Sequence, residues 1–331
     1  MKPPADPGVA GQLRRLIAER GPIPVADYMA VANAHYYANH DSIGASGDFI
    51  TSPEISQVFG ELIGIWLADL WLRAGRPPAA HYVELGPGRG TLAQDSLRAM
   101  AAAGLKPEVE LVETSPILRF RQAERVPDAR WHDDIASLPD EKPLLIVANE
   151  FFDALPMRQY DRSGRELRIG WEGGRFVRDG EVHQEHSPDS VEIVHALAAR
   201  LAAQGGAALI IDYGHDRPGT GDTLQAVSRH QYADPWQEPG ARDLTAHVDF
   251  HALASAARSA GVLVHGPTSQ GEWLEAMGIG LRSERLARAS PGKAGEIAMA
   301  RDRLTGATGM GEMFKVLALT APDWPAPEGF R

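Results

Sequence analysis

Apolar residues before residue 80 recur at the spacing of helices. Two helices are predicted over residues 8–38, separated at Gly21-Pro22, and a longer helix is predicted to begin at Pro53 and to end near Gly75. Proline suits a first helical position because the N–H that it lacks would have no helical partner there. The apolar face of the long helix consists of Ile55, Val58, Phe59, Leu62, Ile63, Trp66, Leu67 and Leu70. Residues 1–79 are therefore predicted to form a helical unit.

Beyond residue 80, short apolar strands alternate with helices. Strands are predicted at 81–85, 109–112, 129–132, 144–147, 207–212, 262–265 and 314–319, and helices at 91–103, 116–124, 190–203 and 249–260. Continuous apolar strands in this alternation predict a parallel α/β sheet with helices on both faces. Two insertions interrupt the series, a charged and glycine-rich hairpin pattern at about 157–186 and a stretch rich in proline and glycine at about 214–247. Insertions of this length are typical of substrate-binding elements.

Composition narrows the classes of function. The 331 residues include no cysteine, which excludes disulfides, cysteine metal sites and cysteine nucleophiles. A net charge of −11 disfavours a general nucleic-acid binder, because such proteins usually carry a basic surplus. No apolar run exceeds five residues, so no membrane insertion is expected. The N-terminus lacks a hydrophobic signal core and the features of a transit peptide, and we therefore expect a cytoplasmic protein.

A glycine-rich turn follows the first predicted strand. Gly86, Gly88 and Gly90 have the spacing G-x-G-x-G, which differs from the dinucleotide spacing G-x-G-x-x-G. Glycines here let the backbone turn tightly and approach a ligand. Glu84 lies two residues before the turn, within the strand, where it suits an ammonium group better than a pyrophosphate.

Further acidic residues follow the next two strands. Glu113 lies at the carboxyl end of the second strand. In open α/β sheets, a side chain at this position can reach the ribose hydroxyls of a nucleoside ligand. Asp134-Ile135 follows the third strand, where a carboxylate can accept a hydrogen bond from an adenine amino group, although the neighbouring Asp133 fits equally well. A pocket for adenosine, ribose and an amino-acid head group indicates S-adenosyl-L-methionine (SAM) as the cofactor.

Several motifs resemble one family of class I methyltransferases. They are GDFITSPEISQVFGELIG, VELGPGRGTLAQDSLRAM, VETSPILRFRQ, VANEFFDALPMRQY, IIDYGH and LTAHVDF. The resemblance extends in blocks from about residue 22 to residue 320. The family contains the arginine methyltransferase that acts as an assembly factor for mitochondrial respiratory complex I, together with many bacterial relatives.

The resemblance implies a Rossmann-like class I methyltransferase fold and a division of the chain. Residues 1–79 would be an N-terminal helical lid, and residues 80–331 the SAM-binding domain with its two insertions. Thr51 and Ser52 resemble the part of the lid that covers the cofactor. The implied cofactor contacts are Gly86, Gly88 and Gly90 with the methionine part, Glu84 with its amino group, Glu113 with the ribose, and Asp134 and Ile135 with the adenine.

Catalysis is assigned to the segment after the fourth strand. Methyl transfer is an in-line displacement, which requires the acceptor atom to be held opposite the sulfur. A guanidinium acceptor has no free lone pair at neutral pH, so carboxylates are needed to orient it and to take up its proton. Glu150 and Asp153, with Asn149 beside them, are the candidates, and Asp48 is a weaker one. Alternatively, both acids cap the following turn.

The sequence leaves alternatives open. The predicted function is SAM-dependent methylation of a protein arginine, and a respiratory-complex subunit is one possible acceptor. A small-molecule methyltransferase and a SAM-binding assembly chaperone without turnover are the alternatives. No metal site is expected, because the histidine spacings, including His247 and His251, lack a third ligand. A location in the mitochondrial matrix would apply only if a transit peptide is missing from this chain, and the oligomeric state cannot be predicted.

Overall fold

The computed structural model describes residues 8–39, 50–219, 221–228 and 231–330. Its central sheet is built from β2 (His81–Leu85), β3 (Glu108–Val112), β4 (Arg130–His132), β5 (Leu144–Asn149), β10 (Gly206–His215), β14 (Val248–Asp249), β15 (Leu263–Ser269) and β16 (Phe314–Thr320). The strand order is β15-β16-β10-β5-β2-β3-β4, and the short β14 pairs with β10. The predicted strands are therefore all present in one sheet.

The sheet is parallel except for one strand, β16, which lies next to the edge strand β15. Strands β4, β3, β2, β5 and β10 run parallel, as predicted. The predicted parallel sheet has one exception, β16, which runs antiparallel to β10 and to β15. Helix α12 (Met310–Met313) leads directly into β16, and Phe314 lies opposite Tyr213 near the carboxyl end of β10. The chain thus enters β16 at the carboxyl end of the parallel strands, and β16 can only run in the direction opposite to theirs.

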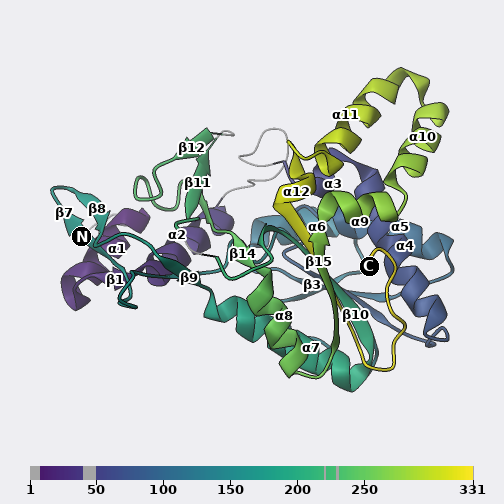
Figure 1. The fold of residues 1–331 in the computed structure, drawn as a ribbon, viewed down its shortest axis with the longest axis horizontal. Helices are drawn as coiled ribbons and strands as arrows, with labels where there is room; N and C mark the ends of the chain where they lie inside the picture. Colours follow the sequence, from purple (N-terminus) through teal and green to yellow (C-terminus); the bar gives the residue numbers. More distant parts are fainter. Residues whose placement is uncertain (1–7, 40–49, 220, 229–230, 331) are drawn as a thin grey trace, which may run out of the picture.

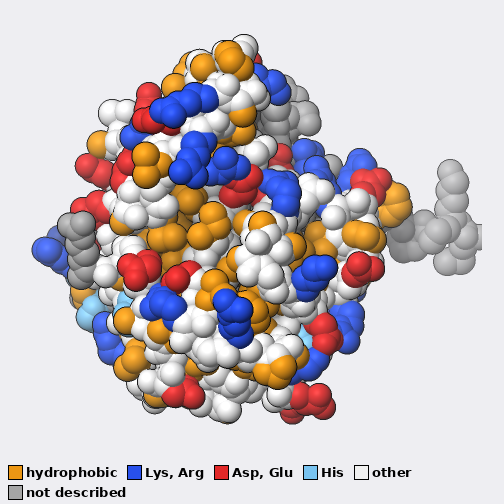
Figure 2. Space-filling view, turned by 90° about the vertical axis from the view of Figure 1, so that its right-hand side faces the viewer, with side chains coloured by type: hydrophobic (Ala, Val, Ile, Leu, Met, Phe, Trp, Pro, Cys, Tyr) orange, Lys and Arg blue, Asp and Glu red, His pale blue; other side chains and the backbone are white. Residues whose placement is uncertain are grey.

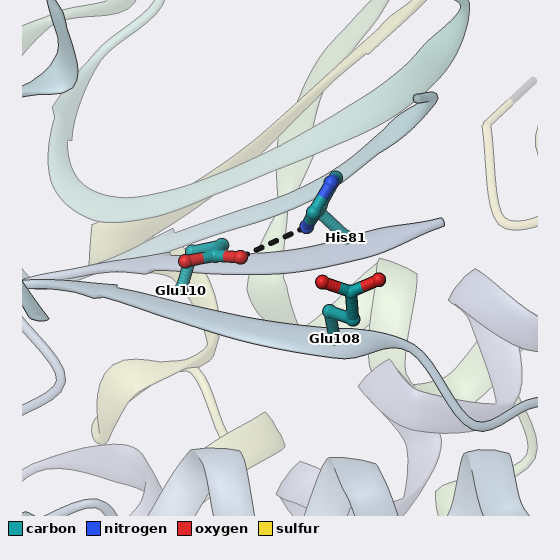
Figure 3. Close-up of side chains that lie close together, drawn as sticks. All are labelled: His81, Glu108 and Glu110. Atoms are coloured by element: carbon teal, nitrogen blue, oxygen red, sulfur yellow. Dashed lines mark hydrogen bonds and ion pairs between the residues drawn. The ribbon is translucent and has the colours of Figure 1, made fainter. Parts of the chain in front are cut away.

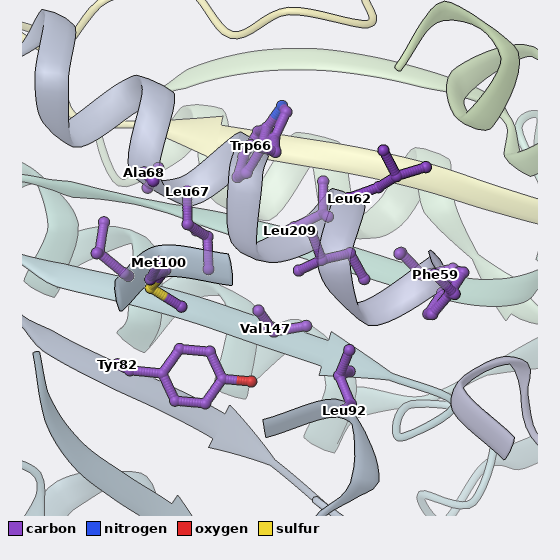
Figure 4. Packing of buried hydrophobic residues seen from close by; sticks show 14 of the residues in the cluster. Phe59, Leu62, Trp66, Leu67, Ala68, Tyr82, Leu92, Met100, Val147 and Leu209 are labelled. Atoms are coloured by element: carbon purple, nitrogen blue, oxygen red, sulfur yellow. The ribbon is translucent and has the colours of Figure 1, made fainter. Parts of the chain in front are cut away.

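Helices cover both faces of the sheet, as predicted. Helices α4 (Gln57–Arg73) and α5 (Thr91–Ala102) pack on one face, and α7 (Pro188–Gln204) and α8 (Phe250–Ser259) pack on the other. Figure 4 shows the first of these cores, where α4 side chains meet the side chains of the central strands. Burial of these apolar surfaces is the main stabilisation of the fold. It also fixes the positions of the strand ends that carry the candidate site.

The predicted helix from Pro53 to Gly75 is divided in two. Helix α3 (Ser52–Ile55) and helix α4 are separated by Ser56, which has an extended backbone with φ −155° and ψ 130°. The Ser56 side chain accepts a hydrogen bond from the backbone N–H of Val58 at 3.2 Å and so caps α4. Apolar periodicity alone could not reveal this break, because the apolar positions continue across it.

A second, smaller core joins segments that are far apart in the sequence. Helices α1 (Gly8–Arg20) and α2 (Val25–Asn39) share it with strands of both insertions, and Figure 1 shows these elements together at the left of the sheet. The strands around this core are β1 (Ile23–Pro24), β7 (Arg168–Glu172), β8 (Arg175–Arg178), β11 (Gln225–Ser228), β12 (Gln231–Ala233) and β13 (Asp243–Thr245). Helix α4 belongs instead to the core on the sheet. The predicted N-terminal unit therefore contributes to two different cores.

Other helices and strands complete the described structure. They are α6 (Pro116–Arg125), β6 (Arg158–Tyr160), β9 (Gln184–His186), α9 (Gln270–Ala276), α10 (Ile279–Ala289), α11 (Ala294–Thr305) and the 3-10 helices Ile135–Ser137 and Pro291–Lys293. Within the described residues, no helix is long and apolar enough to cross a membrane. On the face shown in Figure 2, basic and acidic side chains are interspersed. That face is not the continuous basic surface expected of a nucleic-acid binder.

Candidate active site

A cleft lies at the carboxyl ends of β2 and β5. Three segments line it, and the residues that they contribute are Thr51, Pro53, Glu54, Glu84, Gly86, Pro87, Gly88, Arg89, Thr91, Leu92, Asn149 and Glu150. The cleft thus brings together candidate residues from the predicted lid, the glycine turn and the segment after β5. Ligands of open α/β sheets typically bind at this end of the strands.

The backbone of the glycine turn requires glycine. The φ angles of Gly86, Gly88 and Gly90 are 61°, 53° and 80°, in the left-handed region that other residues rarely adopt. A Cβ atom at Gly86 would also lie 2.9 Å from the Cδ2 atom of Phe151, which is too close for two carbon atoms. The turn therefore presents bare backbone to the cleft and packs tightly against the segment that follows β5.

Glu84 is a buried carboxyl at the edge of the cleft. Its side chain is only 2% exposed, and this burial raises its pKa from 4.5 to about 7. The hydroxyl of Tyr82 donates a hydrogen bond to Glu84 Oε2 at 2.5 Å, which opposes the rise in pKa. An ammonium group in the cleft would favour the ionised form further.

Glu150 lies across the cleft in an unusual backbone conformation. Its φ angle is 52°, and its backbone N–H donates to the carbonyl of Ile211 at 2.9 Å. Its carboxylate Oε1 accepts from the backbone N–H of Ser52 at 3.0 Å and from the side chain of Asn149 at 3.2 Å. Burial raises the pKa of Glu150 to about 7. These bonds connect Glu150 to Ser52, the first residue of α3, and to its neighbour Asn149, and they do not cap the turn that follows it.

Asp153 lies on the other side of the same turn. It is buried and lines a neighbouring cleft with residues of β9, α7 and α8. Burial raises its pKa to about 6, opposed by a hydrogen bond with Tyr213. Within the described part of the chain, Asp153 Oδ1 and Asn149 Oδ1 are buried and accept no hydrogen bond. Buried acceptors normally have partners, so these two atoms are unusual in lacking a donor.

Asp212, which the sequence analysis did not single out, holds this turn in place. Its Oδ2 atom accepts hydrogen bonds from three successive backbone N–H groups, those of Phe151, Phe152 and Asp153, at 3.1, 2.9 and 3.3 Å. The side chain is fully buried, and burial together with the charges of Asp153 and Glu150 raises its pKa. The capping considered for Glu150 is therefore carried out by Asp212. In the sequence, the one feature that could have indicated a role for Asp212 was its position at the end of the fifth predicted strand.

Comparison with known proteins now decides the family. A model of S-adenosyl-L-methionine-dependent methyltransferases matches residues 62–173 and 172–268 of this chain. The chain belongs to this family. Its cofactor is SAM, as predicted, and its reaction is SAM-dependent methyl transfer.

Individual relatives and solved structures agree with this assignment. The chain is 38% identical to the mitochondrial protein arginine methyltransferase NDUFAF7 homolog of Drosophila melanogaster, over 94% of this chain and 84% of that protein. It is 36% identical to the mitochondrial protein arginine methyltransferase NDUFAF7 of Homo sapiens, over 96% and 85%. A crystal structure of a Burkholderia thailandensis protein bound to S-adenosyl-homocysteine has a TM-score of 0.86, with 29% identity and coverage of 97% and 93%.

Glu113 lies at the end of β3, outside the residues that line the cleft. Its Oε1 atom accepts from the backbone N–H of Ser115 at 2.8 Å, and its Oε2 atom accepts from the side chain of Gln122 at 3.3 Å. Gln122 also donates to the carbonyl of Gly88 at 2.7 Å. Gln122, which sequence reasoning missed, therefore links the carboxylate assigned to the ribose with the glycine turn of this methyltransferase.

Asp134 and Ile135 also lie outside the cleft lining. The Asp134 carboxylate accepts from the backbone N–H groups of Ala136 and Ser137, both at 3.0 Å, and so caps a short 3-10 helix. The neighbouring Asp133 forms an ion pair with Arg119 at 2.6 Å. Both carboxylates already have partners, and contact of either one with adenine stays a prediction.

The predicted lid residues occupy different positions. Thr51 lines the cleft, whereas the Ser52 side chain is fully buried and faces Gln270 at 3.5 Å. Beside them, Glu54 accepts a hydrogen bond from Thr91 at 2.6 Å, which connects α3 to the start of α5. Asp48, the weaker catalytic candidate, lies outside the described residues.

One cluster of the described residues has the composition of a metal site. His81, Glu108 and Glu110 lie close together at the amino ends of β2 and β3, at the opposite end of the strands from the cleft (Figure 3). Arg130 pairs with both glutamates, and Lys142 pairs with Glu108. These cations already neutralise the carboxylates, so the cluster is better described as an ion-pair network at the amino ends of the strands.

Proposed function

We propose that this methyltransferase transfers the SAM methyl group to the guanidinium of an arginine in a protein acceptor. The observation that carries the proposal is a pair of buried carboxyl groups on one turn after β5: Glu150, which lines the cofactor cleft, and Asp153, which lines the neighbouring cleft. A guanidinium is the side chain best matched to such a pair, because it is a cation with several donors. The names of the relatives in Drosophila melanogaster and Homo sapiens support the same acceptor.

The catalytic roles follow from the chemistry of this acceptor. Glu150 accepts a hydrogen bond from the nitrogen that receives the methyl group, and Asp153 binds the far side of the guanidinium and accepts the proton that methylation releases. Asn149 Oδ1 and Asp153 Oδ1 are buried acceptors that would complete this set. Ionisation of Glu150 is opposed by burial until the cationic acceptor enters, since an opposite charge favours the ionised carboxylate. In-line transfer then depends mainly on positioning.

The same proposal assigns the cofactor contacts. Glu84 binds the amino group of SAM, and the glycine turn cradles its methionine part. Glu113 binds the ribose hydroxyls. The adenine contact is assigned to Asp134 and Ile135. Support for the first two assignments comes from the cleft itself, which Glu84, Gly86 and Gly88 line.

Residues 51–55 are proposed to act as a lid over the cofactor, within a lid unit of residues 1–79. Thr51 and Glu54 line the cleft, and Ser52 donates its backbone N–H to Glu150. A lid that bonds to Glu150 would exclude water from the reacting atoms and position the carboxylate at the same time. The SAM-binding domain proper is proposed to be residues 80–331.

The acceptor and the place of action are also proposals. A protein subunit of a respiratory complex is the first acceptor to test, because of the resemblance to complex I assembly factors. We propose the cytoplasm of a bacterium as the place of action, since a chain without cysteine suits a reducing compartment. Cell fractionation with an antibody against the chain would test the location.

The function can be tested by following the methyl group. Purified protein would be incubated with tritiated SAM and an extract from cells that lack this gene, and labelled proteins would be hydrolysed and analysed by mass spectrometry. We expect methylarginine in a small number of proteins, and far less with Glu150→Gln. Label confined to small molecules would favour a small-molecule methyltransferase, and SAM binding without any labelled product would favour a chaperone.

A further inference from the structure

Tyr82 carries a hydroxyl into a mostly apolar core, where the buried Ser96 of α5 also lies within hydrogen-bond reach of it. It lies in β2 and is completely buried between the sheet and helices α4 and α5. Figure 4 shows its ring among Leu67, Met100 and Val147, with the hydroxyl pointing along the strand toward Leu92. Leu92 is one of the residues that line the cofactor cleft. The hydroxyl is therefore directed from the core toward the ligand site.

The partner of this hydroxyl is Glu84, two residues further along the same strand. Residues i and i+2 of a strand project from the same face, so the two side chains lie side by side. Tyr82 donates to Glu84 Oε2 at 2.5 Å. Among the described residues, no hydrogen bond reaches the other oxygen, Oε1, while Glu84 itself lines the cleft. One oxygen is thus held by the core, and the other is available to a ligand.

We propose that Tyr82 is a positioning residue that orients the Glu84 carboxylate and keeps it ionised for the amino group of SAM. The proposal rests on the role of Glu84 proposed above, and it adds a residue that does not itself touch the cofactor. A phenol is suited to this task because it supplies one donor from an apolar environment. Phenylalanine would fill the same volume without the donor.

The physical effect is on the charge state of Glu84. A hydrogen bond donated to a carboxylate stabilises the ionised form, so the Tyr82 hydroxyl limits the rise caused by burial and the pKa of Glu84 reaches about 7. The other charged groups that line the cleft are Arg89 of the glycine turn, Glu54 of α3 and Glu150 after β5. Without the hydroxyl, the pKa of Glu84 should rise further, and a neutral carboxyl binds an ammonium group poorly.

The test is calorimetric binding of S-adenosyl-homocysteine to Tyr82→Phe, which needs no methyl acceptor. At pH 6 we expect affinity about tenfold below that of the unchanged protein, since a hydrogen bond to a charged group is lost. At pH 8.5 the ratio should approach one, because Glu84 then ionises in both proteins. Comparing the two proteins at the same pH removes the ligand's own titration. An equal loss at both pH values, or no loss at either, would overturn the proposal.

Matched variants separate this effect from folding and from the role of Glu84. Tyr28→Phe removes the hydroxyl of another fully buried tyrosine, which donates to the carbonyl of Pro235 at 3.2 Å in the smaller core. It should leave the affinity unchanged. In a Glu84→Gln background, Tyr82→Phe should cause no further pH-dependent loss, and such a loss would refute the proposed coupling. If Glu84→Gln alone binds as tightly as the unchanged protein, the assignment of Glu84 is wrong and the inference falls with it.

Discussion

Replacement of Glu150 by glutamine tests the proposed active site most directly. Glutamine keeps the size of the side chain and the Oε1 acceptor, so the bonds from Ser52 and Asn149 can remain. The charge is lost, and the second acceptor oxygen becomes an NH2 donor. A guanidinium would then lose a charge-assisted pair, worth about 1.5–3 kcal/mol, and the rate of methyl transfer should fall roughly ten- to a hundredfold. Affinity for SAM should be retained, because Glu150 is assigned to the acceptor.

The same variant should change stability in a direction that can be worked out. Burial raises the pKa of Glu150 from 4.5 to about 7 in the folded protein. The folded form therefore holds its proton more tightly than the unfolded chain, and stability is lost as the pH rises from about 4.5 through 7. Above pH 7 the cost to the folded state is about 3 kcal/mol. Glutamine cannot ionise, so Glu150→Gln should be more stable than the unchanged protein at pH 8 and equal to it near pH 4.5.

Two assays on this one variant distinguish the interpretations. Urea unfolding at pH 5 and pH 8 measures the stability difference, and transfer of tritiated methyl groups to protein measures the rate per folded molecule. A capping role for Glu150 would give lower stability at both pH values and a nearly unchanged rate. An unimpaired rate would remove Glu150 from the active site, and lower stability at pH 8 would refute the burial argument.

Other variants test the remaining parts of the site. Gly88→Val should abolish S-adenosyl-homocysteine binding, because a branched residue is strained at φ 53°; calorimetric binding by the folded variant would contradict this. Glu113→Ala should weaken binding by about 1–3 kcal/mol, whereas Glu108→Ala, at the other end of the same strand, should not change it. Asp212→Asn should slow methyl transfer at unchanged cofactor affinity and speed hydrogen exchange of the three amides that it holds. As a control, Glu110→Gln, a change at another buried carboxyl group, should affect stability alone. If it changed the rates of methyl transfer and of amide hydrogen exchange as much as Asp212→Asn does, the positioning role of Asp212 would be refuted.

The alternation of strands and helices could be predicted because it is a local property. Apolar runs at 144–147 and 207–212 became the buried strands β5 and β10, extended by a few residues at their ends. The glycine turn was also predictable, since its positive φ angles restrict the residue type at each position. The break at Ser56 was not, because the competing signal was a single capping hydroxyl inside a continuous apolar pattern.

Pairings between distant segments could not be predicted from these patterns. The antiparallel direction of β16 depends on where α12 delivers the chain, not on the apolar character of the strand. The smaller core forms only when α1, α2 and both insertions pack together. The sequence pattern of each segment does not indicate which other segments it packs against. Asp212 lies within β10, but it accepts hydrogen bonds from the backbone amides of Phe151 and the next two residues, which are 59 to 61 positions earlier in the chain.

The sequence by itself determined the chemical types in the site of this methyltransferase: the turn of glycines, the acid within β2 and the acids after β5. Each is set by local backbone geometry and by its place at a strand end. Only the tertiary structure decided which oxygen of each acid is held and which is available. Tyr82 holds one oxygen of Glu84, and Ser52 donates to one oxygen of Glu150. Burial then raises the pKa of both carboxyl groups. Desolvation depends on everything packed around a group, so it exists only once the chain has folded.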